Sequence, residues 1–159
     1  MQFTILGGNG FIGRHLVARL REEGHTCHVP DRPLEGLFAT GLGHVIDCIG
    51  LTADYRTRPF DTMEAHACLV ARLLREAHFE SFLYLSSARV YLHGTDGREE
   101  AALSVDPNDP GDLYNISKLA GESLCLAQDR PEIRVVRPTN VFGHDSQSRN
   151  FLTAVMEDA

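Results

Sequence analysis

Short apolar runs alternate with longer amphipathic stretches along most of the chain. The predicted strands are residues 2–6, 25–31, 44–50, 79–87 and 133–138. Between them, residues 11–24, 61–79 and 111–129 place apolar side chains at helical spacing and are predicted to be helices. Strands that alternate with helices of this length predict an α/β fold, a doubly wound parallel sheet flanked by helices.

Two connections depart from this regular alternation. Residues 32–43 leave room for little more than a loop between the second and third strands. Residues 93–112 are polar and rich in Gly, Pro and Asp, so they are predicted to form a long surface loop, a type that is often functional. A further helix is expected at residues 150–159. Because neither a repeat nor a linker divides the chain, we expect one domain over residues 1–159.

A glycine-rich turn follows the first predicted strand. The sequence GGNGFIG places Gly7, Gly10 and Gly13 at three-residue spacing, and Phe11 and Ile12 begin the next helix. Glycine tolerates positive φ and lets an anion approach backbone amides, while the helix dipole favours negative charge at that point. After the first strand of an α/β pattern, this turn predicts a dinucleotide-binding domain of the Rossmann type.

An acidic residue, Asp31, ends the second predicted strand eighteen residues after Gly13. A carboxylate at this place would accept hydrogen bonds from the ribose hydroxyls of an adenosine. A solvated turn residue within VPDRP is the alternative. The neighbouring Arg32 could bind the 2′-phosphate of NADP, so NAD is favoured as the cofactor while NADP stays open.

Polar side chains are also predicted to gather at the carboxyl edge of the sheet. Ser86 and Ser87 end the fourth strand, and the following helix returns Tyr114 and Lys118 to the same edge. Lys118 is the single lysine beside fourteen arginines. A phenol is a poor base at neutral pH unless a cation favours its phenolate, and a compact ammonium could also hold ribose hydroxyls. The alternatives are a solvated helix face for the pair and turn-capping hydroxyls for the serines.

With these motifs in this order, the chain resembles the extended short-chain dehydrogenases/reductases, the group of NAD(P)-dependent nucleotide-sugar epimerases and dehydratases. The resemblance runs from GGNGFIG through YLSSARVY and YNISKLAGE to VVRPTNVFG. It implies that Tyr114 is the acid/base residue and that Lys118 orients the nicotinamide ribose and lowers the pKa of Tyr114. It also implies that Ser87 hydrogen-bonds the reacting oxygen of the substrate.

The motifs and the resemblance together give a set of expected contacts. The expected cofactor contacts are Gly7, Gly10, Phe11, Ile12, Gly13, Asp31, Arg32, Gly50, Ser86, Tyr114, Lys118, Pro138 and Val141. The expected substrate contacts are Ser87, Tyr114 and Asn140, of which Asn140 would face the substrate phosphates.

The chain also departs from the family pattern. Where the family usually carries an Asn in the helix before the fourth strand, alignment places His66, either as a polar anchor or as a partly exposed helix residue. Residues 32–43 leave no room for the family's additional helix and strand beside the adenine. Family members continue well beyond this length, so we expect most of the nucleotide-sugar pocket, which lies in the substrate-binding C-terminal part, to be absent.

The resemblance implies hydride transfer at a secondary alcohol of a nucleotide sugar, with Tyr114 taking the hydroxyl proton. The enzyme would be an NAD(P)-dependent epimerase or dehydratase. A non-catalytic dinucleotide-binding sensor or scaffold stays open, since the connection at residues 32–43 is short and the sequence ends at residue 159. An NADPH-dependent reductase of a small ketone also stays open because of Arg32.

The composition of the chain limits the classes of partner that we expect it to bind. The net charge of -7, without a basic cluster, argues against nucleic acid, and no run approaches the roughly 18 apolar residues of a membrane span. The start of the chain lacks the features of a signal peptide. We therefore expect a cytoplasmic protein that binds a small-molecule substrate, with a homodimer left open.

Cysteine and histidine spacing predicts no metal site. The cysteines at positions 27, 48, 68 and 125 form no C-x-x-C motif, which is typical of buried thiols in a reducing compartment. The cluster HTCH at residues 25–28 lacks a second pair of ligands.

Overall fold

The computed structural model describes residues 1–31, 35–52 and 54–142. Within these residues the strands are β1 (Gln2–Leu6), β2 (Thr26–His28), β3 (His44–Asp47), β4 (Ser81–Leu85) and β5 (Ile133–Val136). The α-helices are α1 (Phe11–Glu22), α2 (Pro59–Met63), α3 (Leu69–Glu76) and α4 (Leu113–Leu126). Shorter helical turns are η1 (Glu35–Ala39), η2 (Glu64–Cys68), η3 (Ala88–Tyr91) and η4 (Pro110–Asp112).

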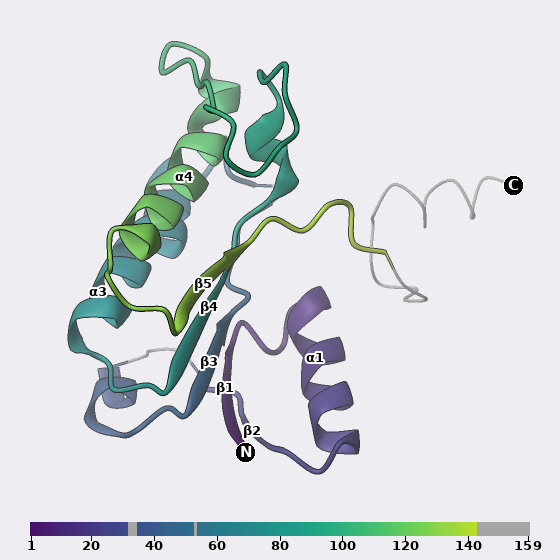
Figure 1. Ribbon diagram of the computed structural model, residues 1–159, viewed down its shortest axis with the longest axis vertical. Helices are drawn as coiled ribbons and strands as arrows, with labels where there is room; N and C mark the ends of the chain where they lie inside the picture. The colour runs from purple at the N-terminus through teal and green to yellow at the C-terminus, as the bar shows by residue number, and fades with distance from the viewer. Residues whose placement is uncertain (32–34, 53, 143–159) are drawn as a thin grey trace, which may run out of the picture.

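The strands form one parallel sheet in the order β2-β1-β3-β4-β5. Figure 1 shows α1 on one face of the sheet and α3 with α4 on the other. The predicted Rossmann-type α/β fold is confirmed. Connections diverge from the centre of the sheet between β1 and β3, and open α/β sheets bind ligands at the carboxyl ends of such neighbouring strands.

The apolar core lies mainly between the sheet and the α3–α4 layer. Inward-facing residues of adjacent strands share this side, because Val45 pairs with Phe82 and Asp47 with Tyr84 in the parallel register. The core residues are Leu6, Leu37, Leu42, Val45, Ile49, Ala65, Leu69, Val70, Leu73, Phe82, Tyr84, Cys125 and Ile133. Apolar positions of β1, β3, β4, β5, α3 and α4 therefore contribute to one core on this side of the sheet.

The strands end earlier than predicted at the carboxyl edge. β2 stops at His28 and β3 at Asp47, whereas the apolar pattern extended each by three residues. Residues 29–31 and 48–50 leave the sheet and line cavities instead. Their apolar character reflects burial at this edge, which a sequence pattern cannot separate from strand structure.

The helix predicted at residues 61–79 runs from Pro59 to Glu76 as three successive parts. The middle part, η2, is a π-helical turn that contains the buried His66. Such π turns in α-helices are frequent at functional sites. The helix α1 ends as predicted, since Gly24 takes a φ of +81° just after it.

The two irregular connections agree with the pattern as far as the structure describes them. In its described residues, the connection between β2 and β3 contains the single turn η1, and Leu37 of this turn is buried. The long loop is fixed by the buried carboxylate of Asp112, which accepts the Asp106 N–H at 2.8 Å and contacts His93 Nε2 and Asn115 Nδ2. The predicted residue Arg32 and the helix expected at 150–159 lie outside the described residues.

Candidate active site

Two adjoining cavities open at the carboxyl ends of β1 and β3. The smaller, about 280 Å³, is lined by the glycine turn, residues 29–31 and residues 48–50. The larger, about 830 Å³, extends past the start of α1 to the ends of β4 and β5 and the N-terminal half of α4. Both include Gly10 and residues 48–50, so they form one continuous site.

The expected contact residues that the structure describes all line one of these cavities. Gly7, Gly10, Asp31 and Gly50 belong to the smaller cavity. The larger cavity contains Phe11, Ile12, Gly13, Ser86, Ser87, Tyr114, Lys118, Pro138, Asn140 and Val141. Segments that are far apart in the sequence therefore meet at the carboxyl edge of the parallel sheet.

The glycine turn is built by close backbone approach. Gly7 has a φ of +71°, and its carbonyl accepts the Gly10 N–H at 2.9 Å. A Cβ on Gly13 would collide with the Gly7 carbonyl oxygen and lie 2.7 Å from the Gly8 Cα, so only glycine fits there. Gly10, the residue directly before α1, provides no side-chain cap, which leaves the N–H groups of the first turn for an anion.

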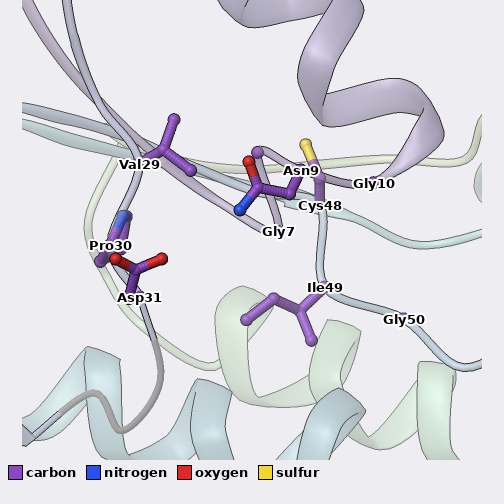
Figure 2. Close-up of a pocket in the computed structure, with 10 residues that line it drawn as sticks. Gly7, Asn9, Gly10, Val29, Pro30, Asp31, Cys48, Ile49 and Gly50 are labelled. Carbon is purple, nitrogen blue, oxygen red and sulfur yellow. The ribbon is translucent and has the colours of Figure 1, made fainter.

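Figure 2 shows the smaller cavity with its lining residues drawn as sticks. The side chains of Asn9, Asp31 and Ile49 point into the same space from three different segments. Asp31 is exposed at the end of this space, where a carboxylate can reach a bound ligand. Asn9 was not singled out from the sequence, although it lies inside the glycine motif.

Ser87 and Tyr114 both line the larger cavity, and the Ser87 hydroxyl acts on the phenol of Tyr114. Burial raises the pKa of Tyr114, while the hydrogen bond from Ser87 and the positive charge of Arg89 lower it. Ser87 Oγ also accepts the Arg89 N–H at 3.2 Å and so caps η3. The capping role and the contact with Tyr114 therefore coexist.

Lys118 is anchored to the end of β4. Its ammonium donates to the Leu85 carbonyl at 2.8 Å and lies 5.0 Å from the centre of the Tyr84 ring. Tyr114 and Lys118 are 6% and 3% exposed, so the solvated-face alternative is wrong. Burial lowers the pKa of Lys118 to about 8, and the charge of Asp47 counteracts this.

Asp47 is a buried carboxylate behind the candidate site. Its Oδ1 accepts the Ile49 N–H at 3.0 Å, and its Oδ2 has no hydrogen-bond partner among the described residues. Burial raises the pKa of Asp47 to about 6, while the Ile49 hydrogen bond and the charge of Lys118 lower it. The carboxylate thus provides negative charge at the end of β3, directly before the cavity-lining residues 48–50.

His66 is fully buried, so the exposed-residue alternative is wrong and the polar-anchor alternative is favoured. Its Nε2 accepts the Leu51 N–H at 3.1 Å, which leaves the proton on Nδ1 for Ser117 Oγ at 2.8 Å. Ser117 Oγ then donates to the Tyr114 carbonyl at 2.8 Å. Burial lowers the pKa of His66 to about 3, so the imidazole is neutral.

Other residues of the site were missed because only the fold reveals their position. Cys48, Ile49 and Thr52 line the cavities. Arg89 lies against Tyr114 although it is outside the YxxxK motif. The sequence feature that could have indicated this contact is the position of Arg89 two residues after Ser87.

The described residues contain no group of three or more His, Cys, Asp or Glu side chains that could hold a metal ion. Within the same part of the chain, no helix is both long and apolar enough to cross a bilayer. The four cysteines are free thiols.

A doubly wound parallel sheet, a glycine turn at its switch point, and Ser, Tyr and Lys side chains in one cavity define a dinucleotide-binding protein of the dehydrogenase type. The chain belongs to the NAD dependent epimerase/dehydratase family, which it matches over residues 3–159.

Individual relatives differ in their named substrates. A 3-beta-hydroxysteroid dehydrogenase of Mycolicibacterium neoaurum is 25% identical over 91% of this chain and 48% of the relative. A GDP-mannose 3,5-epimerase 1 of Oryza sativa subsp. japonica is 27% identical over 90% of this chain and 47% of the relative. The chain thus spans about half the length of the curated relatives it matches.

Among solved structures, MoeE5 in complex with UDP-glucuronic acid and NAD has a similar fold, with a TM-score of 0.75. It is 23% identical, and the alignment covers 99% of this chain and 60% of that structure. This likeness supports the fold assignment.

Proposed function

We propose that the chain forms the NAD(P)-binding part of an enzyme that transfers hydride at a secondary alcohol of a nucleotide sugar, as an epimerase or dehydratase. The observation that carries the proposal is the meeting of Ser87, Tyr114 and Lys118 in the cavity that continues into the glycine turn. Family membership and relatives whose names include an epimerase of a nucleotide sugar support it.

The glycine turn and the adjoining cavity fit a dinucleotide. The pyrophosphate would lie at the uncapped start of α1, where Gly13 permits close backbone approach. Asp31 would bind the adenosine ribose, and Lys118 would hold the hydroxyls of the nicotinamide ribose. When it is bound, the nicotinamide would accept hydride and donate it.

Tyr114 would take the proton from the substrate hydroxyl as hydride leaves the same carbon. Ser87 and Tyr114 line the same cavity, which supports a shared contact with one substrate oxygen. Ser87 would position that oxygen. In this scheme the neutral His66 fixes the first turn of α4 through Ser117, and so keeps the phenol aimed into the cavity.

A dehydrogenase acting on another secondary alcohol is the second candidate. The relative named as a 3-beta-hydroxysteroid dehydrogenase favours it. The same Ser, Tyr and Lys chemistry would act on either substrate, so these residues are common to both candidate functions.

Ligand titration tests the proposal. The purified protein, in the length that its gene encodes, is titrated with NAD and NADP, and then with a panel of UDP-, GDP- and dTDP-sugars and a hydroxysteroid. We expect dinucleotide binding in the micromolar range, and turnover with one nucleotide sugar. Turnover of the steroid alone would favour the second candidate, and failure to bind either dinucleotide would contradict both.

The substitution Gly13→Ala is expected to weaken NAD binding at least about tenfold, which corresponds to about 1.4 kcal/mol. The added methyl group would force the Gly7–Gly8 backbone away from the start of α1. The matched control is Gly97→Ala, because a Cβ at Gly97 meets nothing within 4 Å. Isothermal titration of both variants measures the effect, and equal affinities would show that the turn does not hold the cofactor.

A further inference from the structure

A second cation lies beside the phenol of Tyr114. The guanidinium carbon of Arg89 is 5.5 Å from the centre of the Tyr114 ring and 5.3 Å from that of Tyr55. The two rings are 5.6 Å apart. Arg89 therefore lies against both aromatic rings at the same time.

Hydrogen bonds fix Arg89 in this position. Its backbone N–H donates to Ser87 Oγ at 3.2 Å. Its Nη2 donates to the Tyr55 hydroxyl at 3.1 Å and to the Gly111 carbonyl at 3.2 Å, just before α4. Because these partners come from three segments around Tyr114, the cation has a defined place relative to the phenol.

No carboxylate among the described residues neutralises the charge of Arg89. Among the described residues no carboxylate forms an ion pair with it, and its buried Nε has no hydrogen-bond partner there. Arg137, in contrast, is paired with Glu122 at 2.7 Å. A partly buried cation 5.5 Å from the ring centre of Tyr114, without an ion-pair partner among the described residues, favours the phenolate.

Lys118 is placed differently. It lies one helical turn after Tyr114, but its ammonium is bonded to the Leu85 carbonyl and interacts with the charge of Asp47. Other polar neighbours of Tyr114 among the described residues are Ser87, Ser117 and the neutral His66, whose ring centre lies 5.3 Å from that of Tyr114. Arg89 is thus the cation whose charge lowers the pKa of Tyr114.

We propose that Arg89 is a positioning residue of this site, which stabilises the phenolate of Tyr114 while Lys118 serves the cofactor. The proposal rests on Tyr114 being the acid/base residue. It divides between two side chains the roles that the family resemblance gave to Lys118 alone. It also explains why a cation stands inside the strand-end motif SSARVY.

Direct titration of Tyr114 in the cofactor-free protein tests this division. The chain has four tyrosines and no tryptophan, so tyrosinate absorbance is easily followed, and subtraction of the Tyr114→Phe curve isolates Tyr114. We expect Arg89→Met to raise the pKa of Tyr114 by about 1, and Arg89→Lys to keep it near the wild-type value. The acidic limb of the pH–rate profile, where protonation of the base Tyr114 lowers the rate, should move in the same direction.

The matched control is Arg56→Met. The guanidinium of Arg56 lies 4.7 Å from the centre of the Tyr55 ring, so this variant removes a neighbouring arginine charge without removing the cation at Tyr114. Its Tyr114 pKa should match the wild type. An unchanged Tyr114 pKa in Arg89→Met, or an equal rise in Arg56→Met, would overturn the proposal.

Thermal melting identifies variants that fail to fold. If Arg89→Met does not fold, the titration of Lys118→Met decides the question: an unchanged Tyr114 pKa supports Arg89, and a rise of about 1 assigns the charge to Lys118. The titration uses no substrate. Absence of turnover on every sugar would therefore contradict the proposed function without changing this result.

Discussion

Replacement of Tyr114 by Phe is expected to lower the turnover number by about 10²- to 10⁴-fold, the range that general acid–base groups contribute. The phenol lines the larger cavity together with Ser87 and Lys118. The ring would keep its packing against Tyr55 and His66, because Phe retains the aromatic surface. NAD affinity should therefore change less than about threefold, under 1 kcal/mol.

Steady-state kinetics and cofactor titration on the same preparation separate the two effects. The control is Tyr91→Phe, since the Tyr91 hydroxyl bonds to Arg137 and does not line the cavities. That variant should keep its turnover number. Turnover of Tyr114→Phe close to wild type would remove Tyr114 from the chemistry, and parallel loss of NAD binding would make it a packing residue.

The order of elements and the edge of the sheet that carries the site follow from the sequence, because each rests on a local rule. Apolar periodicity locates β1 and α1, and the glycine spacing requires the tight turn between them. The parallel topology then brings Ser87 and Tyr114 to one edge. Residue types with strong conformational or chemical demands are thus enough to predict this part of the site.

Contacts between distant segments could not be predicted in this way. The tautomer of His66 depends on the Leu51 N–H and on Ser117, which lies 51 residues away, and burial keeps the ring neutral. The role of Arg89 depends on Tyr55, which belongs to the segment after β3. Such contacts carry no periodic signal, and burial decides their charge states.

The substitution Glu122→Ala is expected to cost about 3 kcal/mol of unfolding free energy, because it leaves the Arg137 guanidinium without its counter-charge. Arg137 Nη2 donates to Glu122 Oε2 at 2.7 Å, and Nε contacts both carboxylate oxygens. The side chains of Glu122 and Arg137 are only 3% and 17% exposed. Chemical denaturation measures the loss.

An exposed ion pair gives the matched control. Glu76 contacts Arg72 and Arg75, but the three side chains are 38%, 42% and 71% exposed, so Glu76→Ala should cost far less stability than Glu122→Ala. The double variant Glu122→Leu with Arg137→Met should regain much of the lost stability, since no unpaired charge remains. Equal costs for Glu122→Ala and Glu76→Ala would show that solvent screens the buried pair.

The same ion pair also supports the candidate site. Arg137 directly precedes Pro138, which lines the larger cavity, and Glu122 lies one helical turn after Lys118 on α4. Loss of the pair should release residues 138–142 from α4 and weaken NAD binding at temperatures where the variant is still folded. If Glu122→Ala lost stability but kept full NAD affinity, the pair would stabilise the fold without positioning the cavity wall.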